Sequence, residues 1–175
     1  DNMVVTGESF DYGPWRFLPY SDPGFTAAYF DEQGLYAFGR QPSAALWNLS
    51  QLASCLTLVA DVSSLEKELE RFDGLYRAAF RARMLGVLGL KPVSEERDLV
   101  LLKSLFAWMN ETRAAWPQVF FDWFGGPASE ARAARSPLAK QYAAAGFEPV
   151  RAALMEHETE RPERLGHDYF KGEAP

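Results

Sequence analysis

Cysteine is almost missing from this 175-residue sequence, because Cys55 is the only one. A lone cysteine cannot close an internal disulfide, and with His157 and His167 it supplies too few ligands for a structural zinc site at these spacings. We expect Cys55 to be a buried helical residue, and nothing in the cysteine content indicates an oxidising compartment. The two histidines stand in polar surroundings, which predicts exposed side chains without a catalytic role.

Long apolar runs and blocks of like charge are lacking too. No stretch approaches the roughly 20 apolar residues that a membrane-spanning helix needs. The net charge is −6, from 18 basic and 24 acidic residues that are interspersed; this argues against nucleic acid or a membrane as the main partner. Hydrophobic residues still make up 47% of the chain, which is enough for a folded core.

An initiator methionine and a signal peptide are also missing, because the chain opens on Asp1-Asn2-Met3. We therefore expect a piece of a longer protein. Residues 1–42 are rich in glycine, proline and aromatic side chains and predict loops with one short hairpin. Residues 43–157 change to helical periodicity and predict about five helices, so the predicted fold class is mainly α. The polar residues 158–175 predict a flexible tail.

Start and stop signals divide the helical region. The predicted helices begin after Pro42, at Ser63 (a capping box with Glu66), at Ser94, after Pro117 and at about residue 137. We expect the last of these helices to be interrupted near Gly146 and Pro149. An aromatic cluster around the fourth helix predicts core packing. Its members are Trp116, Phe120, Phe121, Trp123 and Phe124.

Only the first residues carry a sharp chemical signal. If Thr6-Gly7 is the two-residue turn of the predicted hairpin, Asn2 and Asp11 face each other with Cβ atoms roughly 5 Å apart. Two oxygen ligands at that separation suit one Mg²⁺ ion, which prefers hard oxygens and completes its shell with water and phosphate. If Gly7-Glu8 forms the turn instead, the register shifts and Asn2 moves away from Asp11.

The order of motifs in the first third of the chain resembles a known family, the selenoprotein O family. The motifs are Asp1-Asn2-Met3, Phe10-Asp11-Tyr12-Gly13-Pro14-Trp15-Arg16-Phe17-Leu18, Asp22-Pro23-Gly24-Phe25, Gly39-Arg40-Gln41-Pro42 and Leu46-Trp47-Asn48-Leu49. Members of that family have a protein-kinase-like fold, were long regarded as pseudokinases, and transfer AMP from ATP to protein hydroxyls. The resemblance is dense over residues 1–57 and weaker over residues 58–157.

The resemblance implies a portion of a kinase-like C-lobe. Residues 1–42 would supply the metal and nucleotide hairpin and an activation-segment-like loop, and residues 43–157 the helical body. It also implies an adenylyltransferase that uses ATP and Mg²⁺ or Mn²⁺. Its partners would be proteins with Ser, Thr or Tyr hydroxyls, and its location cytoplasmic, or mitochondrial in a eukaryotic source.

Roles carry over to individual residues through the same resemblance. Asp1 matches the catalytic aspartate that accepts a proton, and Asn2 matches a metal ligand. Asp11 matches the second metal ligand, which also contacts the nucleotide phosphates. Arg16 follows this motif closely and is a candidate phosphate or substrate contact, although a structural ion pair is favoured. For Arg40 we expect a structural role.

The sequence leaves two alternatives open and lacks part of the machinery. The family's phosphate-contacting region, strand lysine and paired glutamate would precede Asp1, so we expect the isolated chain to be inactive. One alternative is a kinase-like phosphotransferase, in which the hydroxyl attacks the γ-phosphorus of ATP. The other is a non-catalytic helical scaffold, in which Asp11 is only a turn residue.

Overall fold

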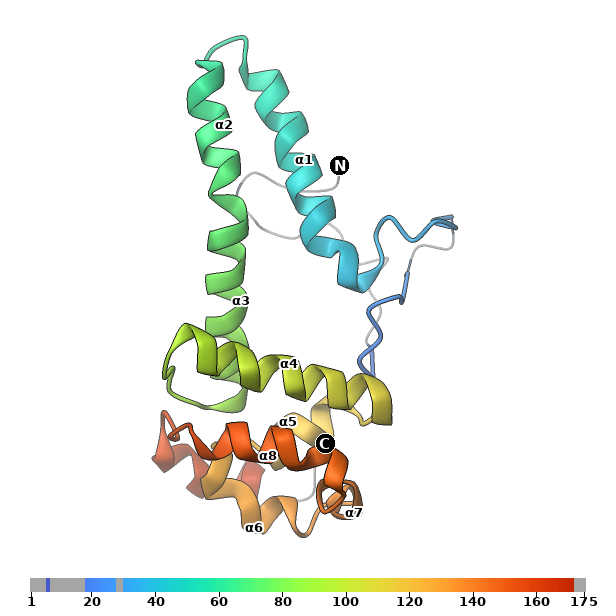
Figure 1. Ribbon diagram of the computed structural model, residues 1–175, viewed down its shortest axis with the longest axis vertical. Helices are drawn as coiled ribbons and strands as arrows, with labels where there is room; N and C mark the ends of the chain where they lie inside the picture. Colours follow the sequence, from blue (N-terminus) through green and yellow to red (C-terminus); the bar gives the residue numbers. More distant parts are fainter. Residues whose placement is uncertain (1–5, 7–17, 28–29, 172–175) are drawn as a thin grey trace. The chain divides into compact units, whose positions relative to one another are not determined.

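The computed structural model describes Thr6 and residues 18–27 and 30–171 (Figure 1). These residues are mainly helical, which confirms the predicted fold class. The predicted hairpin lies outside the described residues except for Thr6, which is exposed in a turn. The described chain forms two compact units. The first contains Leu18 and residues 22–77, and the second contains Pro19–Ser21 and the chain from Ala78 onward.

The first unit is built on two helices that lie side by side, α1 (Gln41–Leu56) and α2 (Val62–Glu70). A 3₁₀ turn, η1 (Phe38–Arg40), leads into α1. Pro42 marks the start of α1 as predicted, but it lies in the first turn of the helix and not ahead of it. The prediction that Ser63 caps the next helix is wrong, because α2 begins earlier. Asp61 caps it instead, accepting a hydrogen bond from the Ser64 N–H at 3.0 Å.

The loop before α1 is held by side-chain contacts to its own backbone. Asp31 accepts hydrogen bonds from the N–H groups of Leu35 (2.8 Å) and Tyr36 (2.7 Å). The Arg40 guanidinium donates to the carbonyl oxygens of Gln33 (3.1 Å) and Gly34 (3.3 Å). Arg40 thus has the structural role that the sequence predicted.

Cys55 is a free and exposed thiol on α1, so the prediction that it is buried is wrong. The physical reason is that α1 packs chiefly against α2, which covers only one side of it. Trp47 and Leu52 of the same helix are 55% and 41% exposed. Helical periodicity identified the helix correctly but could not show how much of its surface is covered.

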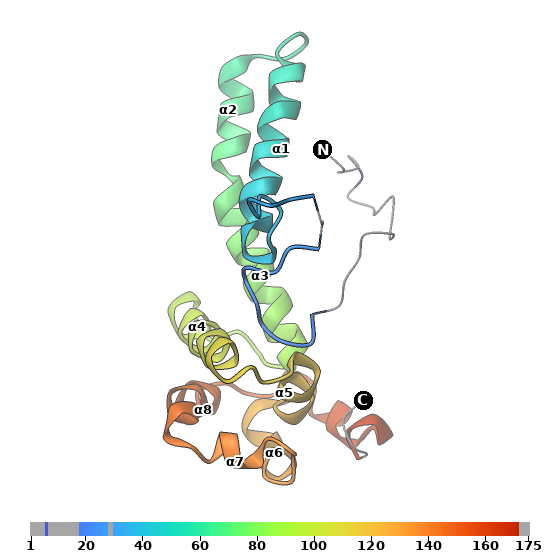
Figure 2. The same cartoon turned by 90° about the vertical axis from the view of Figure 1, so that its right-hand side faces the viewer.

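The second unit starts within α3 (Phe72–Leu88) and contains α4 (Glu95–Thr112), α5 (Trp116–Asp122), α6 (Glu130–Ala133), α7 (Ala139–Tyr142) and α8 (Glu148–Met155) (Figure 2). Short 3₁₀ turns connect or follow them: η2 (Gly126–Ser129), η3 (Ala145–Phe147), η4 (Pro162–Gly166) and η5 (Asp168–Phe170). The predicted interruption of the last helix is confirmed, since α7 ends before Gly146 and α8 begins with Pro149 in its first turn.

The core of the second unit lies where α4 packs against α8. The buried side chains of α4 are Leu101, Leu102, Leu105, Trp108 and Met109, together with Asp98. The aromatic cluster is core as predicted: Trp123 is fully buried and its ring lies 5.3 Å from that of Phe147, centroid to centroid. Each such side chain contributes about 1.5–3 kcal/mol by burial.

Ser94 begins α4 as the sequence predicted, and its hydroxyl accepts a hydrogen bond from the Arg97 N–H at 3.2 Å. Ser94→Ala should therefore lower the free energy of unfolding by about 1 kcal/mol, because one N–H at the helix start loses its acceptor. Urea unfolding of the chain measures the change. Ser94→Asp is the matched control, since a carboxylate also caps; an equal loss in both variants would contradict the capping role.

A flexible tail was predicted over residues 158–175, whereas residues 158–171, the part of it that the structure describes, are paired and packed. The Lys91 N–H donates to the Glu158 carbonyl (2.9 Å), and the Glu160 N–H donates to the Gly89 carbonyl (2.8 Å). Leu90 and Thr159 form an antiparallel bridge between these bonds. The polar side chains of this segment gave no signal for such pairing, because the backbone makes it.

Gly89, at the start of this pairing, has a φ of +64°. A Cβ atom there would lie 2.8 Å from Cζ of Phe124. Glycine is therefore required on both conformational and steric grounds. Phe124 in turn stacks on Phe170 of η5 with ring centroids 4.5 Å apart, which holds the end of the described chain on the core.

Candidate functional site

The predicted site residues Asp1, Asn2, Asp11 and Arg16 lie outside the described residues, so their geometry stays a prediction. Within the described ranges, His, Cys, Asp and Glu side chains form no group of three that could hold a metal ion. No helix among these residues is long and apolar enough to cross a membrane.

The described chain resumes at Leu18 and is then fixed to the second unit by backbone pairing. The Trp116 N–H donates to the Pro19 carbonyl at 3.0 Å, and Tyr20 forms an antiparallel bridge with Ala115. Ser21, next along the chain, is buried. The segment that follows the predicted metal motif is therefore attached to the junction between α4 and α5.

Arg113 completes this attachment. It ends α4 in the left-handed conformation, with φ 55° and ψ 31°. Its guanidinium carbon lies 5.4 Å from the centroid of the Tyr20 ring, within the range of a cation–π contact. Ala114 beside it is buried, and the ring of Trp116 packs 5.4 Å from that of Phe106. The attachment point is thus part of the core.

A buried ionic group lies at the other end of α4. Asp98 and His157 both have side chains with 0% exposure, and His157 Nε2 lies 3.0 Å from Asp98 Oδ1. The same Asp98 oxygen accepts a hydrogen bond from the Val93 N–H at 3.0 Å, and Asp98 Oδ2 lies 3.7 Å from Arg81 Nη1. His157 Nδ1 lies 2.9 Å from the Ala153 carbonyl oxygen. The prediction that His157 is exposed is therefore wrong.

The burial of His157 is explained by the residues three and four positions before it. Ala153 and Leu154 are buried on α8, so a residue at this spacing continues the inward face past the end of the helix. That periodicity was the available signal, and the acidic neighbours Glu156 and Glu158 concealed it. The pair is enclosed in the core, so it holds α4 to the end of α8 and cannot contact a substrate.

A second buried carboxylate, Asp122, ends α5. It accepts hydrogen bonds from Gln118 Nε2 (2.9 Å), from the Tyr142 hydroxyl (2.8 Å) and from the Ser136 hydroxyl. Burial, together with the charge of Asp122, raises the pKa of Tyr142 well above its ordinary value, so Tyr142 stays a hydroxyl donor. Since Asp122 is only 1% exposed, this network joins α5 to α7 and is closed to a ligand.

Arg132 lies beside that network, between two aromatic rings. Its guanidinium carbon is 5.3 Å from the ring centroid of Phe121 and 4.8 Å from that of Phe170, and its Nη2 donates to the Phe124 carbonyl at 2.6 Å. Burial lowers the pKa of Arg132, and the charge of Asp122 opposes that effect. Arg132 thus connects the end of the described chain to α5.

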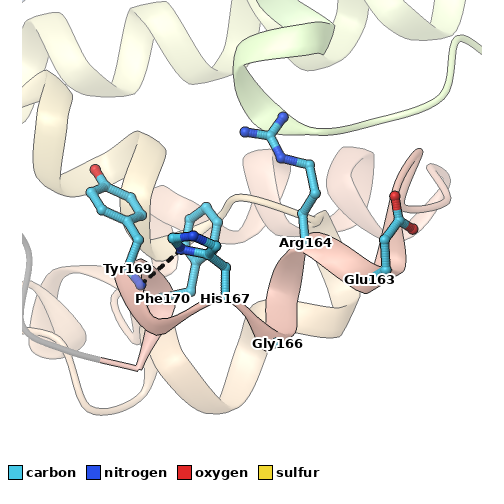
Figure 3. Close-up of a pocket in the computed structure, with 6 residues that line it drawn as sticks. All are labelled: Glu163, Arg164, Gly166, His167, Tyr169 and Phe170. Atoms are coloured by element: carbon cyan, nitrogen blue, oxygen red, sulfur yellow. Dashed lines mark hydrogen bonds between the residues drawn. The ribbon is translucent and has the colours of Figure 1, made fainter.

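A hollow of about 750 Å³ opens beside η4 and η5 (Figure 3). It is lined by Glu163, Arg164, Gly166, His167, Tyr169 and Phe170. His167 is exposed, as predicted, and its Nδ1 accepts a hydrogen bond from the Tyr169 N–H at 3.1 Å. Arg164 lies over the Phe124 ring at 5.1 Å. The charged groups here are exposed and of both signs, so they do not converge on a phosphate chain.

Comparison with known proteins identifies relatives of this chain. The family model described as protein adenylyltransferase SelO matches residues 1–146. The protein nucleotidyltransferase YdiU of Trichodesmium erythraeum is 38% identical over 122 residues, which cover 70% of this chain and 26% of that protein. The protein of the same name from Gloeobacter violaceus is 41% identical over 120 residues, covering 69% and 25%. That from Vibrio parahaemolyticus is 40% identical over 120 residues, covering 69% and 24%.

The chain thus spans about a quarter of the length of the curated relatives it matches. The family model, by contrast, covers most of this chain. Its match runs from Asp1 past the end of α7, and that range contains every predicted site residue. The chain belongs to the SelO protein adenylyltransferase family.

Proposed function

We propose that the protein containing this chain transfers AMP from ATP to Ser, Thr or Tyr hydroxyls of target proteins. The observation that supports this proposal is the match of residues 1–146 to the SelO family, because the matched range contains Asp1, Asn2 and Asp11. The names of the relatives support nucleotidyl transfer as the reaction class.

Three side chains divide the work in this proposal. Asp1 accepts the proton of the target hydroxyl as its oxygen attacks the α-phosphorus of ATP. A new oxygen–phosphorus bond forms, the bond between the α- and β-phosphates breaks, and pyrophosphate leaves. The amide oxygen of Asn2 and the carboxylate of Asp11 are hard ligands that fit Mg²⁺ or Mn²⁺. The bound cation would neutralise charge on the phosphates.

We also propose that the protein acts in the cytoplasm, or in mitochondria if its source is eukaryotic.

Asp11→Ala in the full-length parent protein should weaken Mn²⁺ binding by about ten-fold or more, because one of two protein ligands is lost. Titration with Mn²⁺ in the presence of a non-hydrolysable ATP analogue measures the affinity. Asp73→Ala is the matched control: this carboxylate is exposed on α3 and forms a surface pair with Arg77 at 2.9 Å. Unchanged Mn²⁺ affinity in Asp11→Ala would favour a non-catalytic scaffold.

The position of a radioactive label in ATP distinguishes AMP transfer from phosphoryl transfer. Incubation of the parent protein with α-labelled ATP should label the target protein, whereas γ-labelled ATP should not. The opposite pattern would replace the proposal with phosphoryl transfer.

A further inference from the structure

We infer that the carboxylate of Asp98 holds His157 as a buried imidazolium at neutral pH, and that loss of its proton at alkaline pH loosens the hold between α4 and the end of α8, whatever reaction the parent protein catalyses. Both side chains are fully buried, and His157 Nε2 lies 3.0 Å from Asp98 Oδ1. The bond joins α4 to the segment that follows α8. The second unit thus carries a titratable contact inside its core.

Both ring nitrogens of His157 face an oxygen that accepts hydrogen bonds. Nδ1 lies 2.9 Å from the Ala153 carbonyl oxygen, which can only accept. Nε2 lies against Asp98 Oδ1, which already accepts the Val93 N–H at 3.0 Å. A neutral imidazole has one N–H donor and a carboxylate has none, so these two groups cannot supply a hydrogen to both contacts. One additional proton completes them.

Arg81 on α3 indicates which partner carries that proton. Its Nη1 lies 3.7 Å from Asp98 Oδ2, an oxygen that accepts no hydrogen bond from the described part of the chain. A cation beside Oδ2 favours the ionised carboxylate over the carboxylic acid, so the additional proton belongs to the imidazole. The Arg81 side chain is 28% exposed, and water therefore weakens its repulsion of the imidazolium.

The charged residues on either side of His157 are paired at the surface. Glu156 precedes it and lies 3.4 Å from Arg97 of α4, and Glu158 follows it and lies 2.9 Å from Lys91. All four of these side chains are at least 50% exposed, so solvent screens their effect on the buried imidazole. Asp98 is therefore the carboxylate that keeps the proton on His157.

The direction of the pH dependence follows from the unfolded chain. A histidine there is half-protonated at about pH 6.5, so below that pH both states hold the proton and the contact contributes its full stability. As the pH rises further, the unfolded chain releases the proton while the folded unit retains it. The equilibrium constant for opening then increases by up to about ten-fold per pH unit. Once His157 also loses its proton, one ring nitrogen faces an oxygen without a hydrogen between them.

Nuclear magnetic resonance of the full-length parent protein with ¹⁵N-labelled histidine measures the charge. At about pH 7.5, a full unit above the ordinary histidine value, the ring signals of His157 should be those of an imidazolium. Exposed His167, whose Nδ1 accepts the Tyr169 N–H, should be neutral at the same pH. His157→Gln and His167→Gln assign the two sets of signals. A neutral His157 at this pH would overturn the inference.

Asp98→Asn shows whether the carboxylate is the cause. The amide keeps the size of the side chain and removes its charge, so His157 should become neutral at about pH 7.5 in this variant. An imidazolium that persists in Asp98→Asn would mean that a group other than Asp98 holds the proton, which contradicts the inference.

Hydrogen–deuterium exchange of the full-length parent protein, followed by mass spectrometry on peptides over residues 153–160, measures the hold itself. From about pH 7 to about pH 9, the protection factor, corrected for the intrinsic exchange rate, should fall at least about five-fold. In His157→Gln, which has no titratable ring, protection should be lower at pH 7 and should not change with pH. Peptides over residues 118–136, held by the network around Asp122, are the internal control. A constant protection factor at residues 153–160 in the parent protein, or an equal fall in His157→Gln, would refute the pH-dependent hold.

Discussion

His157→Ala should lower the free energy of unfolding by about 3–5 kcal/mol, because it leaves the carboxylate of Asp98 buried without its imidazole partner. Both side chains have 0% exposure, and the bond that joins them connects residues 59 positions apart. The second ring nitrogen, Nδ1, lies 2.9 Å from the Ala153 carbonyl oxygen, so the imidazole is held at both nitrogens. Urea unfolding followed by tryptophan fluorescence measures the loss, since Trp108 and Trp123 are buried in the same core.

Two comparisons show whether the charge, rather than a cavity, causes the loss. His167→Ala removes an exposed imidazole and should change stability by no more than about 0.5 kcal/mol. In an Asp98→Asn background, His157→Ala should cost much less, because the amide oxygen still accepts the Val93 N–H but carries no charge. An equal cost in both backgrounds would show that lost packing, not an isolated carboxylate, explains the effect.

Asp1→Asn in the full-length parent protein should lower kcat for AMP transfer by about 10²–10⁴-fold. The carboxamide has nearly the same shape as the carboxylate but cannot accept the proton of the attacking hydroxyl. Steady-state transfer of α-labelled AMP to a target protein measures the change, and KM should move far less than kcat.

Metal binding distinguishes the proposed base from the proposed ligands. Asp1→Asn should leave the Mn²⁺ dissociation constant close to that of the parent protein, whereas Asn2→Ala should raise it. If the two variants weaken Mn²⁺ equally, Asp1 is a ligand and another group accepts the proton. Full AMP transfer by Asp1→Asn would exclude Asp1 from the chemistry.

The parts of the fold that sequence reasoning predicted well depend on local signals. Ser94 ahead of an apolar periodic segment predicted the start of α4, and its hydroxyl makes the expected bond. Pro42 predicted the start of α1 in the same way. Such signals act within one helical turn, so a single stretch of sequence contains them in full.

The parts that were missed depend on contacts between distant residues. The residues around His157 do not indicate that Asp98 is its partner, and the residues around Thr159 do not indicate that it pairs with Leu90. The prediction that Cys55 is buried was wrong for a different reason. Its helix was predicted correctly, but the described part of the chain leaves that side of α1 exposed. Periodicity identifies a face, whereas the neighbours that cover it are set by the tertiary fold.

The candidate site also has parts that the sequence could predict and parts that it could not. Asp1, Asn2 and Asp11 could be named from oxygen-ligand chemistry and from the order of motifs, and their spatial arrangement stays a prediction. The contact between Arg113 and Tyr20 could not be predicted in this way, because an arginine that ends a helix and a tyrosine in a loop are ordinary in sequence. Only the backbone pairing of Tyr20 with Ala115 and the left-handed φ of Arg113 single them out.

The pairing of residues 89–91 with residues 158–160 also has a consequence for synthesis on the ribosome. The earlier strand leaves the exit tunnel long before its partner has been translated, because 66 residues (92–157) separate the two. During that interval the apolar face of α4 lacks α8, and Leu90 lacks the backbone that covers it. A nascent chain in this state exposes apolar surface, and folding of the second unit must finish after translation has passed Glu160.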